Sequence, residues 1–359
     1  MKHGLACLLS AIAMLALTAS IAIAGPPDHP IRVGILIADP EHNPGDQALV
    51  EALRELGYAA GRNVIFKYKS AEGRPELFAP LAKEIIDSGV DVLVTPANGP
   101  TMAAAKATQT IPIVMIGASD VVETGLVASL ARPGKNITGF AINAAEIAAK
   151  RVQLLQEAVP RLSRIAVLWN ASIRSMALGF QNIEQASPKL GIALQSVRVS
   201  GSDEFGQAFA AVEDGHPDGL IVLFGPLRGD DLPRIVDFVV RHKIPTIFEV
   251  GRGISGGGLM EFGPNLEPMF RRAAVYIDKI ANGADPATLP VEEPTQFELA
   301  INLKAAKAMG IEIPHRCCCA PIVSSNSAGV STWAGCASPS GHQETSPCRA
   351  PTRHGRSGR

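Results

Sequence analysis

The residues of this sequence best suited to bind a metal lie near its end, in the stretch IPHRCCCAPIVSSN. Three consecutive cysteines, Cys317, Cys318 and Cys319, come shortly after His315. Thiolates and imidazoles are the ligands that zinc prefers in proteins. Taken alone, this stretch suggests a metal site, but its meaning depends on the kind of chain that precedes it.

Signatures of catalysis are scarce elsewhere. The sequence contains no Walker A loop, no G-x-S-x-G elbow and no H-E-x-x-H motif. A G-x-G-x-x-G pattern runs from Gly251 to Gly256, but the residues after it, GGLMEFG, resemble a strand. A dinucleotide site needs a helix N-terminus there, to hold the pyrophosphate. We interpret the segment as a glycine-rich connection and predict a protein without catalytic residues, metal or cofactor.

A more informative group of residues stands where predicted strands end. Parallel sheets bind ligands outside the carboxyl ends of their strands. Backbone N–H groups at a helix start there can hold an anion, and a carboxylate can receive an ammonium group. The alternative for Ser119 and Asp120 is helix capping alone. The predicted ligand-binding residues are Asp39, Pro40, Pro96, Ala97, Asn98, Ser119, Asp120, Asn170, Phe224 and Glu249.

The elements that position these residues alternate along the chain. Apolar runs such as IRVGILIA (31–38), VDVLVTP (90–96) and IPIVMIGA (111–118) predict buried strands. Segments between the strands, among them 45–57, 75–89, 99–110 and 121–131, have the spacing of helices. This alternation predicts an α/β fold with parallel sheets and helices on both faces. The pattern restarts near residue 140, which predicts two similar lobes around one cleft.

Charge and the N-terminus limit the classes of function. The net charge is −1 with both signs dispersed, which predicts no nucleic-acid partner. Residues 1–24 begin with Lys2, continue through an apolar run and end in Ala22-Ile23-Ala24, the layout of a signal peptide cleaved near Ala24. The alternative is an uncleaved membrane anchor, because the run is nearly long enough to span a bilayer. We therefore expect export to the periplasm.

Several long stretches resemble one family. IPIVMIGASDVVETGLVASLARPGKNITGF (111–140), together with residues 53–68 and 269–311, closely resembles ABC-transporter substrate-binding proteins of the tryptophan/tyrosine-binding-protein-like kind. The resemblance runs from about Ile31 to Pro314. It implies a type 1 periplasmic-binding-protein architecture, with a multi-strand hinge between a lobe at 30–141 plus 265–285 and a lobe at 142–264 plus 286–314.

The same resemblance implies a function. Such a protein, expected to be a monomer, captures an amino acid or similar small metabolite and passes it to a permease and an ATPase. One departure concerns the pocket, because the family often has ADPVG where this chain has SDVVE (119–123), so that Glu123 alters the local charge. Two other functions remain open from the residues: a nucleotide-cofactor enzyme of doubly wound fold, and a periplasmic ligand-sensing domain.

The resemblance also explains the cysteines. Family members end in a sequence similar to IPPTLLLRADRVIE, predicted to be a terminal helix packed on the second lobe. Ordinary GC-rich codons for LLLRADRVIE, read in a shifted frame, translate as RCCCAPIVSSN, which is the sequence of residues 316–326 here. We therefore interpret residues 315–359 as an out-of-frame, disordered tail. A metal site becomes the weaker alternative, and the loss of the terminal helix is predicted to uncover an apolar groove.

Overall fold

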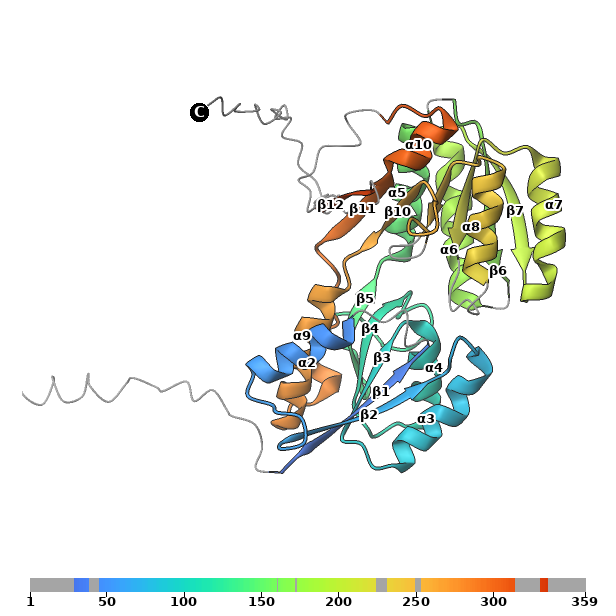
Figure 1. Cartoon of the computed structure of the whole chain (residues 1–359). Coiled ribbons are helices and arrows are strands. Elements are labelled where there is room, and N and C mark those ends of the chain that lie inside the picture. The colour runs from blue at the N-terminus through green and yellow to red at the C-terminus, as the bar shows by residue number, and fades with distance from the viewer. Residues whose placement is uncertain are drawn as a thin grey trace, which may run out of the picture.

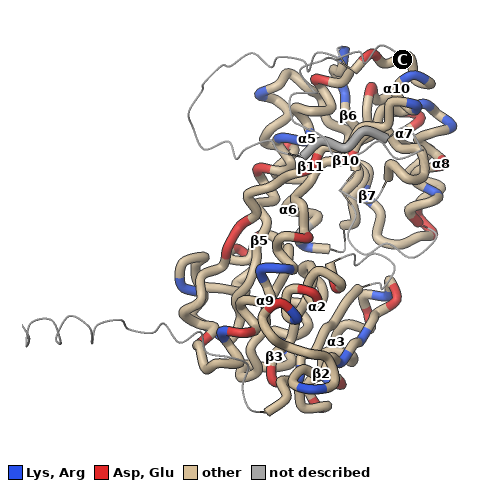
Figure 2. Tube along the Cα trace, turned by 60° about the vertical axis from the view of Figure 1, so that its left-hand side comes forward, with Lys and Arg blue, Asp and Glu red and all other residues tan. Residues whose placement is uncertain are grey.

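The computed structural model describes residues 29–38, 45–159, 161–171, 173–223, 231–248, 253–313 and 330–334. The predicted signal peptide, His315 and all five tail cysteines lie outside these ranges. Two sheets, each flanked by helices, form two lobes (Figure 1). Lys, Arg, Asp and Glu are interspersed over both lobes (Figure 2).

The first sheet has five parallel strands in the order β2-β1-β3-β4-β5. Its strands are β1 (Ile31–Ile37), β2 (Val64–Ser70), β3 (Val92–Pro96), β4 (Ile113–Ser119) and β5 (Ile137–Ile142). Successive side chains of a strand point to opposite faces, and both faces are apolar here. Helices α2 (Gly45–Glu55) and α9 (Glu267–Ala281) cover one face, and α3 (Phe78–Asp87, after η2 at Pro75–Leu77) and α4 (Asn98–Ala107) cover the other.

The second sheet has seven strands in the order β12-β11-β10-β9-β8-β6-β7. Five of them run parallel, namely β6 (Arg164–Asn170), β7 (Ala193–Val199), β8 (Gly219–Leu223), β9 (Thr246–Phe248) and β10 (Met260–Pro264). Strand β11 (Phe297–Asn302) is antiparallel to β10, and β12 (Val330–Ala334) is antiparallel to β11. Strand β12 lies within residues 315–359, which were expected from the sequence to form a disordered tail, so it was not predicted.

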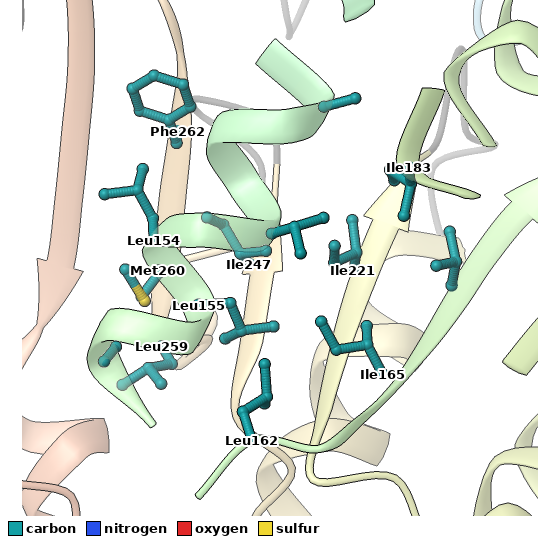
Figure 3. Packing of buried hydrophobic residues seen from close by; sticks show 14 of the residues in the cluster. Leu154, Leu155, Leu162, Ile165, Ile183, Ile221, Ile247, Leu259, Met260 and Phe262 are labelled. Carbon is teal, nitrogen blue, oxygen red and sulfur yellow. The ribbon is translucent and has the colours of Figure 1, made fainter. Parts of the chain in front are cut away.

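Helices cover both faces of this sheet as well. On one face lie α5 (Ala144–Ala158), α6 (Arg174–Ala186, continued by η3 at Ser187–Leu190) and α10 (Leu303–Met309). On the other lie α7 (Phe205–Gly215, after η4 at Ser202–Glu204) and α8 (Asp231–Arg241). Figure 3 shows Leu155 of α5 on the side of Ile165, Ile221 and Ile247 of the sheet, and Leu154 beside Met260 and Phe262. The predicted α/β fold with two Rossmann-like lobes is therefore confirmed.

Three connections join the lobes within the described residues (Figure 1). They run from β5 into α5, from β10 into α9, and from η5 (Pro286–Thr288) into β11. The third stays with the first sheet as far as Glu292, whose backbone exchanges hydrogen bonds of 2.9 Å with Gly139 and Ala141 of β5. Residues 286–292 thus pack on the first lobe, although the sequence analysis assigned 286–314 to the second.

The side chain of Glu292 ties this connection to α9. Arg272 donates from Nε and Nη2 to both carboxylate oxygens, at 3.1 and 2.9 Å, and the Tyr276 hydroxyl lies 3.0 Å from Oε1. The hydrogen bond from Arg272 is the main reason why the pKa of Glu292 lies below its usual range. A carboxylate of lowered pKa stabilises the fold at pH above about 4.3, and this stabilisation is lost as the pH falls through the lowered pKa.

Replacing Glu292 by glutamine is therefore expected to lower the free energy of unfolding by about 1 kcal/mol at pH 7, since the pair is partly exposed. The difference from the unchanged protein should shrink at pH 3. Urea unfolding at the two pH values measures it. Glu55→Gln, which removes the exposed carboxylate bound by Arg271, is the control and should change stability by less than about 0.5 kcal/mol. Equal effects of the two substitutions at pH 7 would contradict this prediction.

One predicted helix is wrong. Residues 121–131 were expected to be helical, but the chain makes a turn at 121–125 and continues irregularly to the start of β5. The turn closes through a hydrogen bond of 2.8 Å from Thr124 N–H to the Asp120 carbonyl, and Gly125 then adopts a φ of +73° that ends it. Val121, Leu126 and Val127 are buried in the first lobe. Their apolar spacing imitates a helix, although it serves to anchor a loop.

Candidate functional site

The candidate site lies at the carboxyl ends of β3 and β4, which are neighbours in the first sheet. Pro96 is paired with Ile116 in the register of the two strands, and Ala97 N–H donates to the Ile116 carbonyl at 2.9 Å. Since parallel strands end at the same edge, the loops after β3 and β4 meet there. Five predicted residues, Pro96, Ala97, Asn98, Ser119 and Asp120, are thereby brought together.

Asn98 links the two loops. Its Oδ1 accepts from Ser119 N–H at 2.7 Å, and its Nδ2 donates to the Ser119 carbonyl at 2.9 Å. Asn98 is also the first residue of α4, where Thr101 Oγ1 donates to the Ala97 carbonyl at 2.7 Å. A side-chain amide that satisfies both backbone groups of one residue fixes the distance between the loops. We therefore assign Asn98 a positioning role.

Replacing Asn98 by alanine is expected to destabilise the protein by about 1–3 kcal/mol, because the half-buried N–H and carbonyl of Ser119 lose their partners. Asn98→Asp keeps the acceptor but loses the donor, so an intermediate loss is expected. Thermal and urea unfolding measure both. Asn282→Ala at the exposed end of α9 is the control, with an expected change below about 0.5 kcal/mol. Unchanged stability of Asn98→Ala would show that water replaces the amide.

Both loops have unusual backbone conformations at predicted site residues. Ala97 has φ +67° and Asp120 has φ +54°, in the region that residues with a Cβ rarely adopt. Such conformations cost about 1–3 kcal/mol each and persist only where the surroundings impose them. They are frequent at ligand-binding sites. Two such conformations at the ends of adjacent strands therefore favour this edge of the sheet as a ligand-binding site.

The Asp120 carboxylate is the chemically distinctive group at this edge. Its Oδ2 is buried and has no hydrogen-bond donor among the residues that the structure describes. Burial raises the pKa of Asp120, and the nearby Glu123 carboxylate raises it further. A buried acceptor without a donor is costly unless a ligand supplies one. An ammonium group satisfies it best, because it brings both donors and the opposite charge.

The expected anion sites at helix starts are found at one loop only. After β3, helix α4 begins at Asn98 and its N-cap residue, Ala97, makes no side-chain cap hydrogen bond, so the backbone N–H groups at this helix start are candidates for binding a carboxylate. After β4 no helix follows, and the prediction of a helix N-terminus capped by Ser119 or Asp120 is wrong. The physical reason is the turn at 121–125, in which Asp120 offers its carbonyl rather than its side chain.

In the second lobe, the predicted residues belong to the ends of neighbouring strands. Asn170 is the last residue of β6 and is half-buried, and its carbonyl accepts from Ile173 N–H at 3.3 Å. Phe224 and Glu249 come directly after β8 and β9, which continue the same sheet, but both lie outside the described residues. The same holds for Asp39 and Pro40 in the first lobe. Their roles therefore stay predictions.

Sequence analysis missed Glu261 of β10. This side chain is only 6% exposed, and Oε1 accepts from the backbone N–H groups of Gly253 and Ile254 at 2.6 and 2.7 Å. A protein carboxylate thus already occupies N–H groups of the G-x-G-x-x-G segment, which weighs against a dinucleotide there. These contacts of Gly253 and Ile254 instead agree with the interpretation of the segment as a glycine-rich connection. The signal for Glu261 was a single acid within the apolar run LMEFG.

Two cavities occur away from these loops. One of about 320 Å³ lies beside α6 and the edge strand β7, where it is lined by Trp169, Glu184 and Arg198 among others. Another of about 430 Å³ is largely apolar and is lined by residues of α5 and η3 together with Phe262 and Phe297. Neither is lined by Asn98 or Asp120. The candidate site therefore rests on the strand ends and not on these cavities.

Neither a membrane-spanning helix nor a metal-ligand cluster is found within the described residues. None of the helices in these ranges is both long and apolar enough to cross a membrane. No group of three or more His, Cys, Asp or Glu side chains within the same ranges is placed to hold a metal ion.

Two α/β lobes joined by three connections, with polar loops at their strand ends, define the class of two-lobed binding proteins. Residues 31–322 match the family described as ABC transporter substrate binding protein, and the chain belongs to this family. A tyrosine-binding protein of Clostridioides difficile is 24% identical over 286 residues, which cover 79% of this chain and 81% of the relative.

Solved structures share the fold. A conserved domain protein from Vibrio cholerae has 26% identity and a TM-score of 0.74, over 80% of this chain and 97% of that one. A Streptococcus pneumonia ABC domain in complex with L-Trp has 23% identity and the same TM-score and coverage. A ligand-free, open substrate-binding protein from Clostridium difficile has 24% identity and a TM-score of 0.61, over 79% of this chain and 96% of that one.

Proposed function

We propose that this protein is the periplasmic substrate-binding component of an ABC importer and that it captures an amino acid or a similar small metabolite between its lobes. The observation that carries the proposal is the Oδ2 of Asp120, which is buried and has no hydrogen-bond donor among the described residues, at the strand ends of a chain of this family. An α-amino acid offers an ammonium group to this oxygen and a carboxylate to the start of α4. The tyrosine- and tryptophan-binding relatives support this ligand class.

Binding begins on the first lobe in this proposal. Asn98 holds the loops after β3 and β4 together, so that the ligand meets a site whose geometry is already set. The strand ends of the second lobe, with Asn170, Phe224 and Glu249, then close over the ligand. Closure is a hinge motion through the three connections, and the ligand shifts the balance toward the closed state by its greater affinity for that state.

The protein performs no chemistry of its own in this proposal. A permease and an ATPase receive the closed complex and release the ligand into the cell. The protein acts as an exported monomer whose signal peptide is cleaved near Ala24. A sensing domain would use the same site and the same closure, and differs only in the partner that reads the closed state.

Ligand screening tests the proposal. The full chain is expressed with export to the periplasm, and native mass spectrometry of the purified protein is expected to show a bound small molecule that carries an ammonium group. A thermal-shift screen should then show stabilisation by amino acids and none by nucleotides or dinucleotides. Stabilisation by nucleotides, with no response to any amino acid, would overturn the proposal in favour of a cofactor-binding enzyme.

A further inference from the structure

Strand β7 forms one edge of the second sheet, and among the described residues it pairs with β6 alone. Ala193 N–H donates at 2.8 Å to the carbonyl of Ser163, just before β6, so every second residue of β7 from Ala193 on turns its main chain toward β6. The residues between these turn their N–H and carbonyl groups outward, and they are Leu194, Ser196 and Arg198. Such a row of outward groups is a template for pairing with another strand.

The cavity of about 320 Å³ lies beside this edge. One wall is Trp169 of β6, which is stacked on Phe180 of α6 with ring centroids 5.0 Å apart. Trp169 is only 8% exposed and donates from Nε1 to Ser196 Oγ at 3.0 Å, so its ring is held in place. Ser196 and Arg198, whose main chains face outward, also line the cavity with their side chains. A strand paired with β7 therefore places its own side chains over the cavity.

Opposite charges stand at the two ends of this cavity. Arg198 lies beside Trp169 in the register of β6 and β7, near the carboxyl ends of both strands. Helix α6 runs back toward the amino ends of the strands, and along it Glu184 is about 10 Å beyond Ala177, which also lines the cavity. Within the described ranges, neither Arg198 nor Glu184 takes part in an ion pair or a side-chain hydrogen bond.

The separation of these charges decides between two kinds of occupant. A free amino acid carries its ammonium and its carboxylate on one carbon, so it cannot reach both ends of the cavity. In an extended peptide, side chains on one face recur about every 6.8 Å, so that three of them span Arg198, the aromatic wall and Glu184. The outward main chain of β7 supplies hydrogen bonds to such a peptide and none that a side chain alone requires.

The edge strand of the first sheet lacks this combination. Strand β2 carries Lys67 and Lys69, and lysines on an edge strand discourage pairing with another chain. Neither of the two cavities described above is lined by a residue of β2. The arrangement at β7 is therefore not a general property of the sheet edges in this fold.

We infer that the outer edge of β7 is a docking site for an extended segment of a partner protein, which adds to the second sheet as a further strand. The segment pairs antiparallel to β7, the more stable arrangement per residue. Along its inner face it carries an acidic residue opposite Arg198, a large apolar residue over the cavity, and a basic residue toward Glu184. This inference goes beyond the proposed function, because capture of a small molecule at the strand ends does not use this edge.

Capped synthetic peptides test the inference by fluorescence anisotropy with the full chain. TDTFTKT has the required order of acidic, aromatic and basic residues at alternate positions, with threonines that favour a strand. It is expected to bind about tenfold tighter than TDTATKT, which has no side chain to fill the cavity. TDTFTKT with an N-methyl group on the phenylalanine nitrogen keeps every side chain but loses a main-chain donor toward β7, and its binding should be lost.

Reversal of one charge on the protein tests the direction of the peptide. Arg198→Glu is expected to weaken binding of TDTFTKT about three- to tenfold and to strengthen binding of TKTFTKT, in which the acidic residue is replaced by lysine. The matched control is Arg62→Glu, which reverses an exposed charge of the first lobe and should leave the binding of both peptides unchanged. The N-methyl comparison needs no variant and stands even if Arg198→Glu unfolds.

Several results would overturn the inference. TDTFTKT that does not bind, or that binds no better than its alanine or N-methyl counterpart, shows that the edge does not accept a strand. Displacement of TDTFTKT by an equal concentration of L-phenylalanine assigns the cavity to a small molecule. Dimers of the chain in analytical ultracentrifugation that persist with excess TDTFTKT, under conditions where the peptide fails to bind, assign the edge to a second copy.

Discussion

Replacing Asp120 by asparagine is expected to weaken amino-acid binding by about 10- to 100-fold, because a hydrogen bond to a charged group contributes about 1.5–3 kcal/mol. Asparagine has nearly the same shape and tolerates the positive φ of this position at least as well as aspartate. The substitution thus removes the charge and leaves the backbone in place. Calorimetric titration with the best ligand of the screen measures the loss.

Stability should change in the opposite direction. Burial, followed by the charge of Glu123, raises the pKa of Asp120 in the folded protein. Ionised Asp120 therefore destabilises the free protein at pH 7, and this cost disappears as the pH falls through the raised pKa. Asp120→Asn removes the cost at all pH values, so its melting temperature at pH 7 should exceed that of the unchanged protein.

The combined result distinguishes a binding role from a structural one. Weaker binding together with higher thermal stability is expected only if Asp120 is held ready for a cationic group. Asp214→Asn, which changes an exposed carboxylate of α7, is the control and should alter neither property. Lower stability with unchanged affinity would mean that Asp120 serves the turn alone, and the assignment of the site to this edge of the sheet would fall.

Affinity should also depend on pH. An ammonium ligand pairs with the ionised form of Asp120, whose pKa is raised in the free protein. As the pH falls through this pKa, the carboxyl binds a proton that the ligand must displace, so affinity should decrease. In Asp120→Asn the decrease should be absent in the same range. Titrations between pH 7 and pH 4 give this comparison on the same two proteins.

The strands and the edge that carries the site could be predicted because both follow from local periodicity. Buried parallel strands appear as apolar runs, and their ends are where ligands bind, so Asn98, Ser119 and Asp120 could be named as candidates. Their arrangement could not be predicted. The hydrogen bond between Asn98 and Ser119 joins residues 21 positions apart and forms because β3 and β4 are neighbours in the sheet. The order of strands in a sheet cannot be predicted from a local sequence pattern.

The incorrect and missing predictions have physical causes of the same kind. Residues 121–131 have helical spacing, but Gly125 at φ +73° ends the first turn, and the apolar side chains anchor a loop. Glu261 is unremarkable in the sequence because its donors, Gly253 and Ile254, come to it through the fold of the chain. In both cases tertiary contacts decide what local preference leaves open.

The second large effect concerns the reading frame after His315. We expect a chain that continues as TLLLRADRVIE, in place of the present tail, to be more stable by about 2–4 kcal/mol, since each Leu-sized side chain that becomes buried contributes about 1.5–3 kcal/mol. For a protein of this size the melting temperature should rise by roughly 3–7 °C. Differential scanning calorimetry of the two chains, each with the same residues up to His315, measures the difference.

The structure provides places where such a segment could pack. Strand β11 accepts β12, formed by Val330–Ala334, along its outer edge, so this edge pairs with a later part of the chain. The apolar cavity of about 430 Å³ beside Phe262 and Phe297 belongs to the same lobe. That the terminal helix would cover it stays a prediction. In the restored frame, three consecutive leucines come shortly after His315. In the present frame, residues 310–329 separate α10 from β12.

Two comparisons identify the cause of any increase in the melting temperature. Replacing all five tail cysteines by serine in the present frame tests whether thiol cross-linking lowers stability, and this variant should gain less than about 2 °C. Sequencing the gene around the His315 codon tests the slipped base directly. If the base sequence is secure and the restored chain melts no higher, then the cysteine-containing tail is a genuine part of the protein, and zinc titration of His315 and its neighbouring thiols becomes the experiment to perform.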